Sequence, residues 1–126
     1  MSYVANLMKA KSLMGKSVGD GQCIAFVHAV TTIPPTPFWR KGERVKGANL
    51  PIGTIIATFD VNGRYGNHLD GSSHGAIYLG QNAHGILVLD QWKGHSTTQP
   101  VHERLIRFKK GTGIKVDDGD QYYVVD

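Results

Sequence analysis

The chain has 126 residues, of which 40% are hydrophobic and 19% charged, an ordinary balance for one globular domain with a sizeable core. No apolar run approaches the length of a membrane-spanning helix. The single cysteine excludes an internal disulfide and a cysteine-rich zinc site. The net charge of +4 is compatible with an anionic partner such as nucleic acid or bacterial cell wall. The densest basic cluster, Arg104, Arg107, Lys109 and Lys110, favours a solvated strand face.

The pattern along the chain predicts helices first and strands afterwards. Residues 3–13 are typical of an amphipathic helix with Val4, Leu7 and Met8 on one face, and residues 21–31 of a second helix with Asp20 as its N-cap. Residues 32–50 read as a proline-containing connection. Strands are expected at 54–59, 75–79, 86–90, 101–108 and 121–125, with a loop rich in Gly, Asn and Asp at 60–73. This order predicts an α+β fold.

The only cysteine, Cys23, lies in the first turn of the second predicted helix. The positive end of the helix dipole favours the thiolate there, which is the form that attacks a carbonyl carbon. Backbone amides at the same helix start could hold the oxyanion that forms. The structural alternative is that Cys23 is a small buried hydrophobe.

Two later residues could complete a catalytic site. A thiol nucleophile needs a base near neutral pH, and His74 stands at the start of a predicted strand. Asp90 ends the next strand and could orient His74, because a short turn makes the two strands neighbours. His68 is the rival base, and Gln91 is a rival orienting group that strand alternation would point to the opposite face.

The residues around these positions resemble the CHAP and NlpC-type amidases of the papain-like superfamily, in which Cys, His and a third polar residue follow in this order. The resemblance covers residues 17–125. Its motifs are Gly-Gln-Cys at 21–23, a Leu-Pro-Ile-Gly-Thr-Ile-Ile-Ala strand at 50–57, Ser-His-Gly-Ala-Ile-Tyr at 73–78 and Val-Leu-Asp-Gln-Trp at 88–92. The short chain looks most like the small amidase effectors of type VI secretion systems.

This resemblance implies a papain-like fold, with N-terminal helices packed on an antiparallel sheet, and one catalytic domain spanning residues 1–126. It implies a cysteine-dependent peptidoglycan amidase or endopeptidase with Cys23, His74 and Asp90 as catalytic residues and no cofactor or metal. Gln22 and Trp92 are expected to contact substrate. Trp92 stands where many relatives have Asn, and Trp39 either lines the substrate groove or packs in the core.

The same resemblance implies an antibacterial toxin. No signal peptide is visible, so we expect synthesis in the cytoplasm, secretion by another route and action in the periplasm of rival bacteria. The expected partners are peptidoglycan peptide, a cognate periplasmic immunity protein and a component of the secretion apparatus, with no nucleic acid and no membrane span.

Two further alternatives concern other classes of function. A non-catalytic basic module that binds nucleic acid or cell wall would place aromatic residues among Lys and Arg on a sheet face, but the strands carry mostly aliphatic residues. A metal site built from His68, Asp70 and His74 is disfavoured by its spacing. The other histidines, His28, His84, His95 and His102, are expected to be surface or structural residues.

Overall fold

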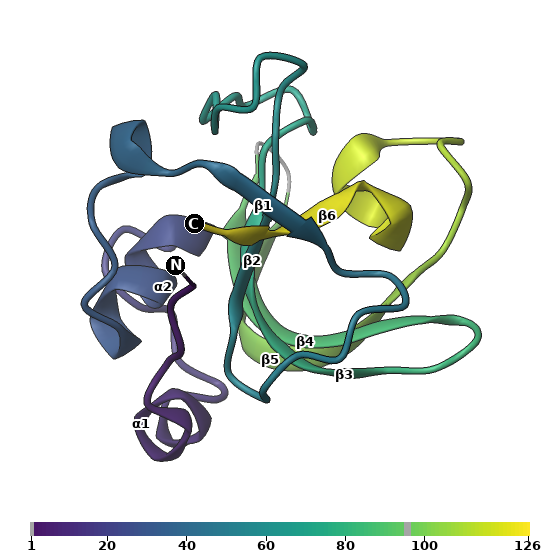
Figure 1. The fold of residues 1–126 in the computed structure, drawn as a ribbon. Coiled ribbons are helices and arrows are strands. Elements are labelled where there is room, and N and C mark those ends of the chain that lie inside the picture. Colours follow the sequence, from purple (N-terminus) through teal and green to yellow (C-terminus); the bar gives the residue numbers. More distant parts are fainter. Residues whose placement is uncertain (1, 95–96) are drawn as a thin grey trace.

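The computed structural model describes residues 2–94 and 97–126 and has the predicted α+β architecture (Figure 1). His95 therefore lies outside the described residues. The two α-helices are α1 (Leu7–Ser12) and α2 (Cys23–Val30). The strands are β1 (Lys41–Arg44), β2 (Ile55–Thr58), β3 (Gly75–Gln81), β4 (Gly85–Lys93), β5 (Thr98–Arg107) and β6 (Tyr122–Val125). No described helix is long and apolar enough to cross a membrane.

The six strands form one sheet in the order β1-β6-β2-β3-β4-β5, and every neighbouring pair is antiparallel. Both helices lie on one side of this sheet, and the segment that leads to β6 lies on the other (Figure 1). The strands that follow one another along the chain from β2 to β5 also pair with one another. In this arrangement the start of β3, which His74 precedes, and the end of β4, near which Asp90 lies, are at the same end of the sheet.

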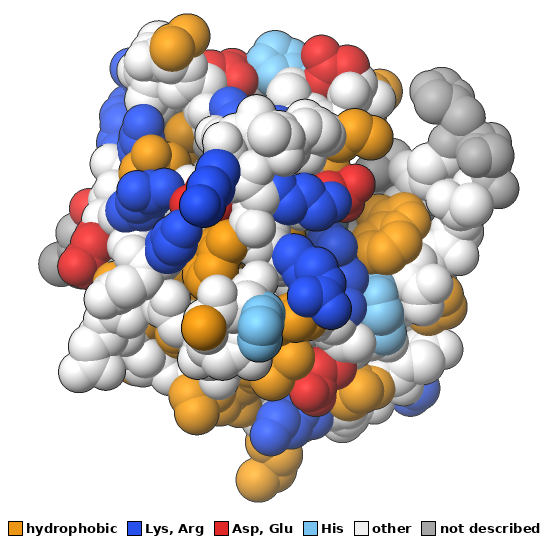
Figure 2. Space-filling view, turned by 90° about the vertical axis from the view of Figure 1, so that its right-hand side faces the viewer, with side chains coloured by type: hydrophobic (Ala, Val, Ile, Leu, Met, Phe, Trp, Pro, Cys, Tyr) orange, Lys and Arg blue, Asp and Glu red, His pale blue; other side chains and the backbone are white. Residues whose placement is uncertain are grey.

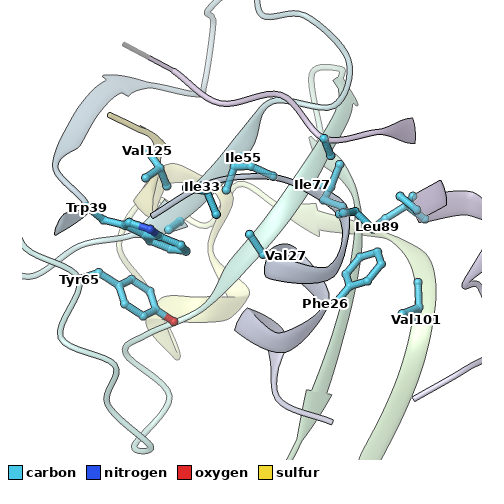
Figure 3. Close-up of a cluster of buried hydrophobic side chains, with 14 of the residues drawn as sticks. Phe26, Val27, Ile33, Trp39, Ile55, Tyr65, Ile77, Leu89, Val101 and Val125 are labelled. Atoms are coloured by element: carbon cyan, nitrogen blue, oxygen red, sulfur yellow. The ribbon is translucent and has the colours of Figure 1, made fainter. Parts of the chain in front are cut away.

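Both faces of the sheet are buried, which explains the nearly continuous apolar runs of the strands. On the helix side, Ile55, Ile77 and Leu89 lie in register across β2, β3 and β4 and pack against α2 (Figure 3). On the other side, a second cluster is built from the alternating positions of these strands, with one residue each from β5 and β6 and with Val45 from the segment after β1. Its buried members are Val45, Ile56, Ala76, Tyr78, Ile86, Val88, Ile106 and Tyr122.

Two predictions of local structure were wrong. The first helix begins at Leu7, because the Asn6 side chain caps it by accepting the Lys9 N–H, while Val4 forms a bridge with Thr54. Met8 is 85% exposed, so the predicted buried face was wrong as well. The connection at 32–50 contains the polar edge strand β1, which shows no apolar alternation.

The loop before α2 also differs from the prediction. Gln22, not Asp20, is the N-cap of α2. The Asp20 carboxylate accepts the Gln22 N–H at 2.9 Å and so closes a turn one step before the helix begins. Gly19 and Gly21 in this turn have φ of +60° and +88°, a conformation that other residues adopt only with strain. The helix therefore begins at Cys23 and not at residue 21, and the prediction that Cys23 lies in its first turn is confirmed.

Candidate active site

The three residues that the sequence singled out lie together at one end of the sheet. Cys23 is buried at the first position of α2, and its thiol lies close enough to the His74 side chain for the two groups to interact electrostatically. The His74 Nε2 donates to Asp90 Oδ2 at 2.7 Å, which leaves the Nδ1 side of the ring for the thiol. His74 and Asp90 are both buried, and Asp90 is fully so. This chain of contacts can generate a thiolate nucleophile and a paired imidazolium.

The backbone around His74 is fixed by β2. The His74 N–H donates to Thr58 Oγ1 at 3.0 Å, and the Thr58 N–H donates to the His74 carbonyl at 3.0 Å. Gly75, the next residue, lies against Ile24 and Trp39, where a Cβ atom would come within 2.9 Å of the Ile24 Cδ1. The absence of a side chain at this position lets α2 approach β3 closely, and this brings Cys23 to His74.

Asp90 has a second partner that the sequence did not reveal. The Arg104 guanidinium grips its carboxylate, with Nε 2.9 Å and Nη2 2.8 Å from Oδ2. Arg104 belonged to the cluster expected on a solvated strand face, and for this residue the prediction was wrong. In the β4–β5 register Asp90 faces His102, so Arg104 lies two residues along on the same face. Only the register of the β4–β5 pair places Arg104 beside Asp90, and the sequence pattern does not give this register.

The rest of that cluster follows the prediction. Arg107, Lys109 and Lys110 are exposed. Figure 2 shows that Lys and Arg side chains gather over the middle of the face that lies on the side of the C-terminal segment, with Asp and Glu side chains among them.

A tyrosine from the predicted loop at 60–73 also reaches the thiol. The Tyr65 hydroxyl lies 3.8 Å from Cys23 Sγ, and its ring packs on Trp39 with 5.0 Å between centroids (Figure 3). Burial raises the pKa of Tyr65 well above its usual value, and the neighbouring Cys23 adds to the rise. Tyr65 therefore remains a neutral donor that can stabilise the thiolate. Nothing local in the sequence marked this residue.

The charges of the site reinforce one another. Burial raises the pKa of the Cys23 thiol, but the positive His74 ring and hydrogen bonds from His74, the Gly75 backbone and Tyr65 outweigh it and hold the pKa below its usual value. Burial lowers the pKa of His74, yet Cys23 and Asp90 raise it to about 9. Burial raises the pKa of Asp90, but His74 and Arg104 hold it low. The directions of these pKa shifts favour a thiolate–imidazolium pair backed by a carboxylate.

The site opens into a cleft of about 470 Å³. Cys23 and His74 line it, and so do both residues expected to contact substrate, Gln22 and Trp92. Trp39 is fully buried and donates its indole N–H to the Pro34 carbonyl, so of its two alternatives the structure shows core packing.

His68, the alternative candidate for the catalytic base, is paired with another residue. His68 lies at the cleft, is 45% exposed in its side chain and pairs with Asp60 at 2.8 Å. Asp70 accepts hydrogen bonds from Ser72. The described residues contain no group of three or more His, Cys, Asp and Glu side chains placed to hold a metal ion. The geometry thus pairs Cys23 with His74 and leaves His68 at the rim.

None of the other histidines within the described residues lines the cleft. His28 and His84 are exposed. His102 is half-buried and donates from Nδ1 to the backbone carbonyls of Asp90 and Pro100, both at 3.1 Å.

Asp90→Asn tests the electrostatic chain. The amide removes the negative charge that stabilises the imidazolium, so the pKa of His74 is expected to fall from about 9 toward its usual value near 6.5. The thiol pKa is expected to rise in turn, because its neighbour is positive over a narrower pH range. NMR titration of the His74 ring measures the first shift, and the pH dependence of thiol alkylation measures the second. Asp60→Asn, which removes the partner of His68, is the control, and an unchanged His74 titration in Asp90→Asn would contradict the scheme.

Comparison with known proteins agrees with this site. The family model described as "Domesticated amidase effector 2" matches residues 2–125. A "Type VI secretion amidase effector 2 protein" of Salmonella typhi is 34% identical over 135 residues, which cover all of both chains. A solved structure of "Type 6 secretion amidase effector 2 (Tae2)" matches with a TM-score of 0.82 and 36% identity, over 98% of this chain and 94% of that one. The expected papain-like fold and the resemblance to type VI amidase effectors are confirmed, and the chain belongs to the domesticated amidase effector 2 family.

Proposed function

We propose that this protein hydrolyses amide bonds in the peptide part of peptidoglycan, with Cys23 as nucleophile, His74 as general acid and base, and Asp90 as the residue that orients His74. The observation that supports this most directly is that Cys23 and His74 line one cleft and interact electrostatically, while His74 is hydrogen-bonded to the buried Asp90 carboxylate. Residues 1–126 act in this proposal as a single catalytic domain.

The reaction follows from the positions of these groups. The Cys23 thiolate adds to the substrate carbonyl, and the carbonyl oxygen becomes an oxyanion facing the first backbone N–H groups of α2, which have no partner within the helix. The His74 imidazolium then gives its proton to the leaving amine as the C–N bond breaks, which leaves a thioester on Cys23. Neutral His74 next removes a proton from water, whose oxygen attacks the thioester. The acid product and the thiolate leave, and His74 is again protonated.

The cleft fits a peptide of this kind. Lys93 and Arg104 line it together with Trp92, and the Arg104 guanidinium lies 4.9 Å from the Trp92 ring centroid. Peptidoglycan peptides carry free carboxylates, so cations along the cleft are complementary to them. Gln22 and Trp92 are the proposed substrate contacts, Gln22 beside the nucleophile and Trp92 as an apolar wall.

We place this activity in the periplasm of target bacteria, because the relatives are named type VI secretion amidase effectors. A component of the secretion apparatus would deliver the protein there. Producing cells would also be exposed when sister cells inject it, so a cognate periplasmic immunity protein is the expected partner. A small convex element inserted into the cleft would cover Cys23 and His74 and block the enzyme.

Cys23→Ala is expected to abolish hydrolysis and leave the fold intact, because it removes one sulfur atom and no scaffold contact of the sheet. The loss of activity should be at least about 1,000-fold, since the covalent route disappears. The measurement is the release of soluble muropeptides from purified sacculi. A Cys23→Ala protein that digests sacculi normally would remove Cys23 from the mechanism. Sacculi that bind the unmodified protein without any release would instead favour the basic binding module.

His74→Ala and His68→Ala form a matched pair, because both residues line the cleft and only His74 contacts the thiol. His74→Ala is expected to lose about 100- to 10,000-fold in rate, the usual contribution of a general acid and base. His68→Ala is expected to lose several-fold at most. The opposite result, with His68→Ala inactive and His74→Ala active, would assign the base to His68.

Expression with and without an added periplasmic signal tests the site of action. A Gram-negative host is expected to lyse when the protein is exported and to grow normally when it remains in the cytoplasm, where there is no peptidoglycan. Exported Cys23→Ala is the control for toxicity unrelated to catalysis. Normal growth with the exported protein present and folded would count against an antibacterial role.

A further inference from the structure

Gln91 is a fully buried glutamine next to Asp90, and its side chain is bound only to backbone atoms. As strand alternation predicts, it leaves β4 on the face opposite to Asp90, toward the helices. Its Oε1 accepts the Val18 N–H at 2.8 Å, and its Nε2 donates to the Val18 carbonyl at 2.9 Å. The side-chain amide thus pairs with Val18 as a neighbouring strand would.

The third hydrogen bond reaches the nucleophile's own peptide. Gln91 Nε2 donates to the Gln22 carbonyl at 2.7 Å. That carbonyl and the Cys23 N–H belong to one planar peptide group, in which C=O and N–H point in opposite directions. Fixing the Gln22 oxygen therefore fixes the direction of the Cys23 N–H, the first of the amides that face the oxyanion in the proposed mechanism.

The segment that Gln91 holds needs an external constraint. Residues 18–22 include two glycines with positive φ, and the N-cap of α2 makes no side-chain hydrogen bond to the helix. Glycine allows many backbone conformations. The Asp20 turn orders the Gln22 N–H. The Gln22 carbonyl accepts the Ala25 N–H of the helix at 3.2 Å, and Gln91 adds a second and shorter hydrogen bond to it at 2.7 Å. The Gly21 N–H closes a turn onto the Val18 carbonyl at 3.0 Å, and the Gln91 amide ties Val18 to β4.

We propose that Gln91 is a positioning residue for the oxyanion site: it orients the Gln22–Cys23 peptide so that the Cys23 N–H meets the developing negative charge. This inference rests on the proposed function. Two consecutive residues of β4 then hold the two halves of the site, Asp90 through His74 and Gln91 through the peptide of Cys23.

The test compares two glutamine-to-methionine variants. Gln91→Met keeps the length and shape of the side chain and removes its hydrogen bonds. Gln81→Met is the matched control, because Gln81 accepts the Gly47 N–H and donates to the carbonyls of Val45 and Ala48, a comparable set of bonds to a loop. Gln81 and two of these partners, Gly47 and Ala48, line a separate hollow that contains no residue of the proposed site.

Two reactions of the thiol distinguish positioning from a general loss of structure. Hydrolysis of a purified muropeptide passes through an oxyanion, whereas alkylation of Cys23 by iodoacetamide does not. Gln91→Met is expected to lose about 10- to 100-fold in kcat, the scale of a misplaced catalytic group, with KM and the alkylation rate changed only a few-fold. Gln81→Met is expected to keep all three values close to those of the unmodified protein.

Several results would overturn the proposal. One is a Gln91→Met protein with the same kcat as Gln81→Met, and another is an equal loss of hydrolysis and alkylation. If Gln91→Met does not fold, Gln91→Glu takes its place: it can still accept the Val18 N–H but puts a carboxylate against two carbonyls, and the same selective loss of kcat is expected. In the unmodified protein the Val18 N–H should exchange with deuterium as slowly as sheet amides, and rapid exchange would also contradict the proposal. An unmodified protein that releases no muropeptide would defeat the proposed function itself, independently of the Gln91 variants.

Discussion

The site depends on a carboxylate with no access to water. Asp90 is fully buried, and its negative charge is stable there only because His74 and Arg104 both donate to it. With the Cys23 thiolate and the His74 imidazolium, the cluster contains two negative and two positive groups and is neutral as a whole. Removing one member of a buried ion pair typically costs about 3–5 kcal/mol, since the other charge is left without compensation. Folding and activation of the thiol are therefore coupled through the same few contacts.

The antiparallel sheet brings these residues together through the pairing of neighbouring strands. β4 pairs with β3 on one side and β5 on the other, so Asp90 lies between the strand that follows His74 and the strand that carries Arg104. Each neighbour contributes one cation to the carboxylate. The helix contributes the nucleophile from the other side, at its positive end, where the dipole and the imidazolium both favour the thiolate.

The sequence predicted the parts of the site that depend on local patterns. Cys23 followed a turn and preceded an apolar helix, and His74 and Asp90 marked strand ends, so their positions could be read from periodicity and from the resemblance of the motifs. Arg104 and Tyr65 could not be found in this way. Arg104 reaches Asp90 only through the β4–β5 register, and Tyr65 reaches Cys23 from a loop whose path depends on packing against Trp39.

The errors in the fold have physical causes as well. Residues 3–5 have the apolar spacing of a helix, but their backbone bonds to the β2 region, where the Tyr3 carbonyl accepts the Ile55 N–H and the Ala5 N–H donates to the Gly53 carbonyl. Tertiary hydrogen bonding thus overrode local propensity. Asp20 was a reasonable cap by residue type, yet the two positive-φ glycines around it move the helix start to Cys23. A further constraint on that start comes from Gln91, which is 69 residues from Gln22 along the chain and adjacent to it in space. A nucleophile held in this way owes much of its position to the sheet, while Tyr65 adds a contact to the thiol from the loop that also carries His68.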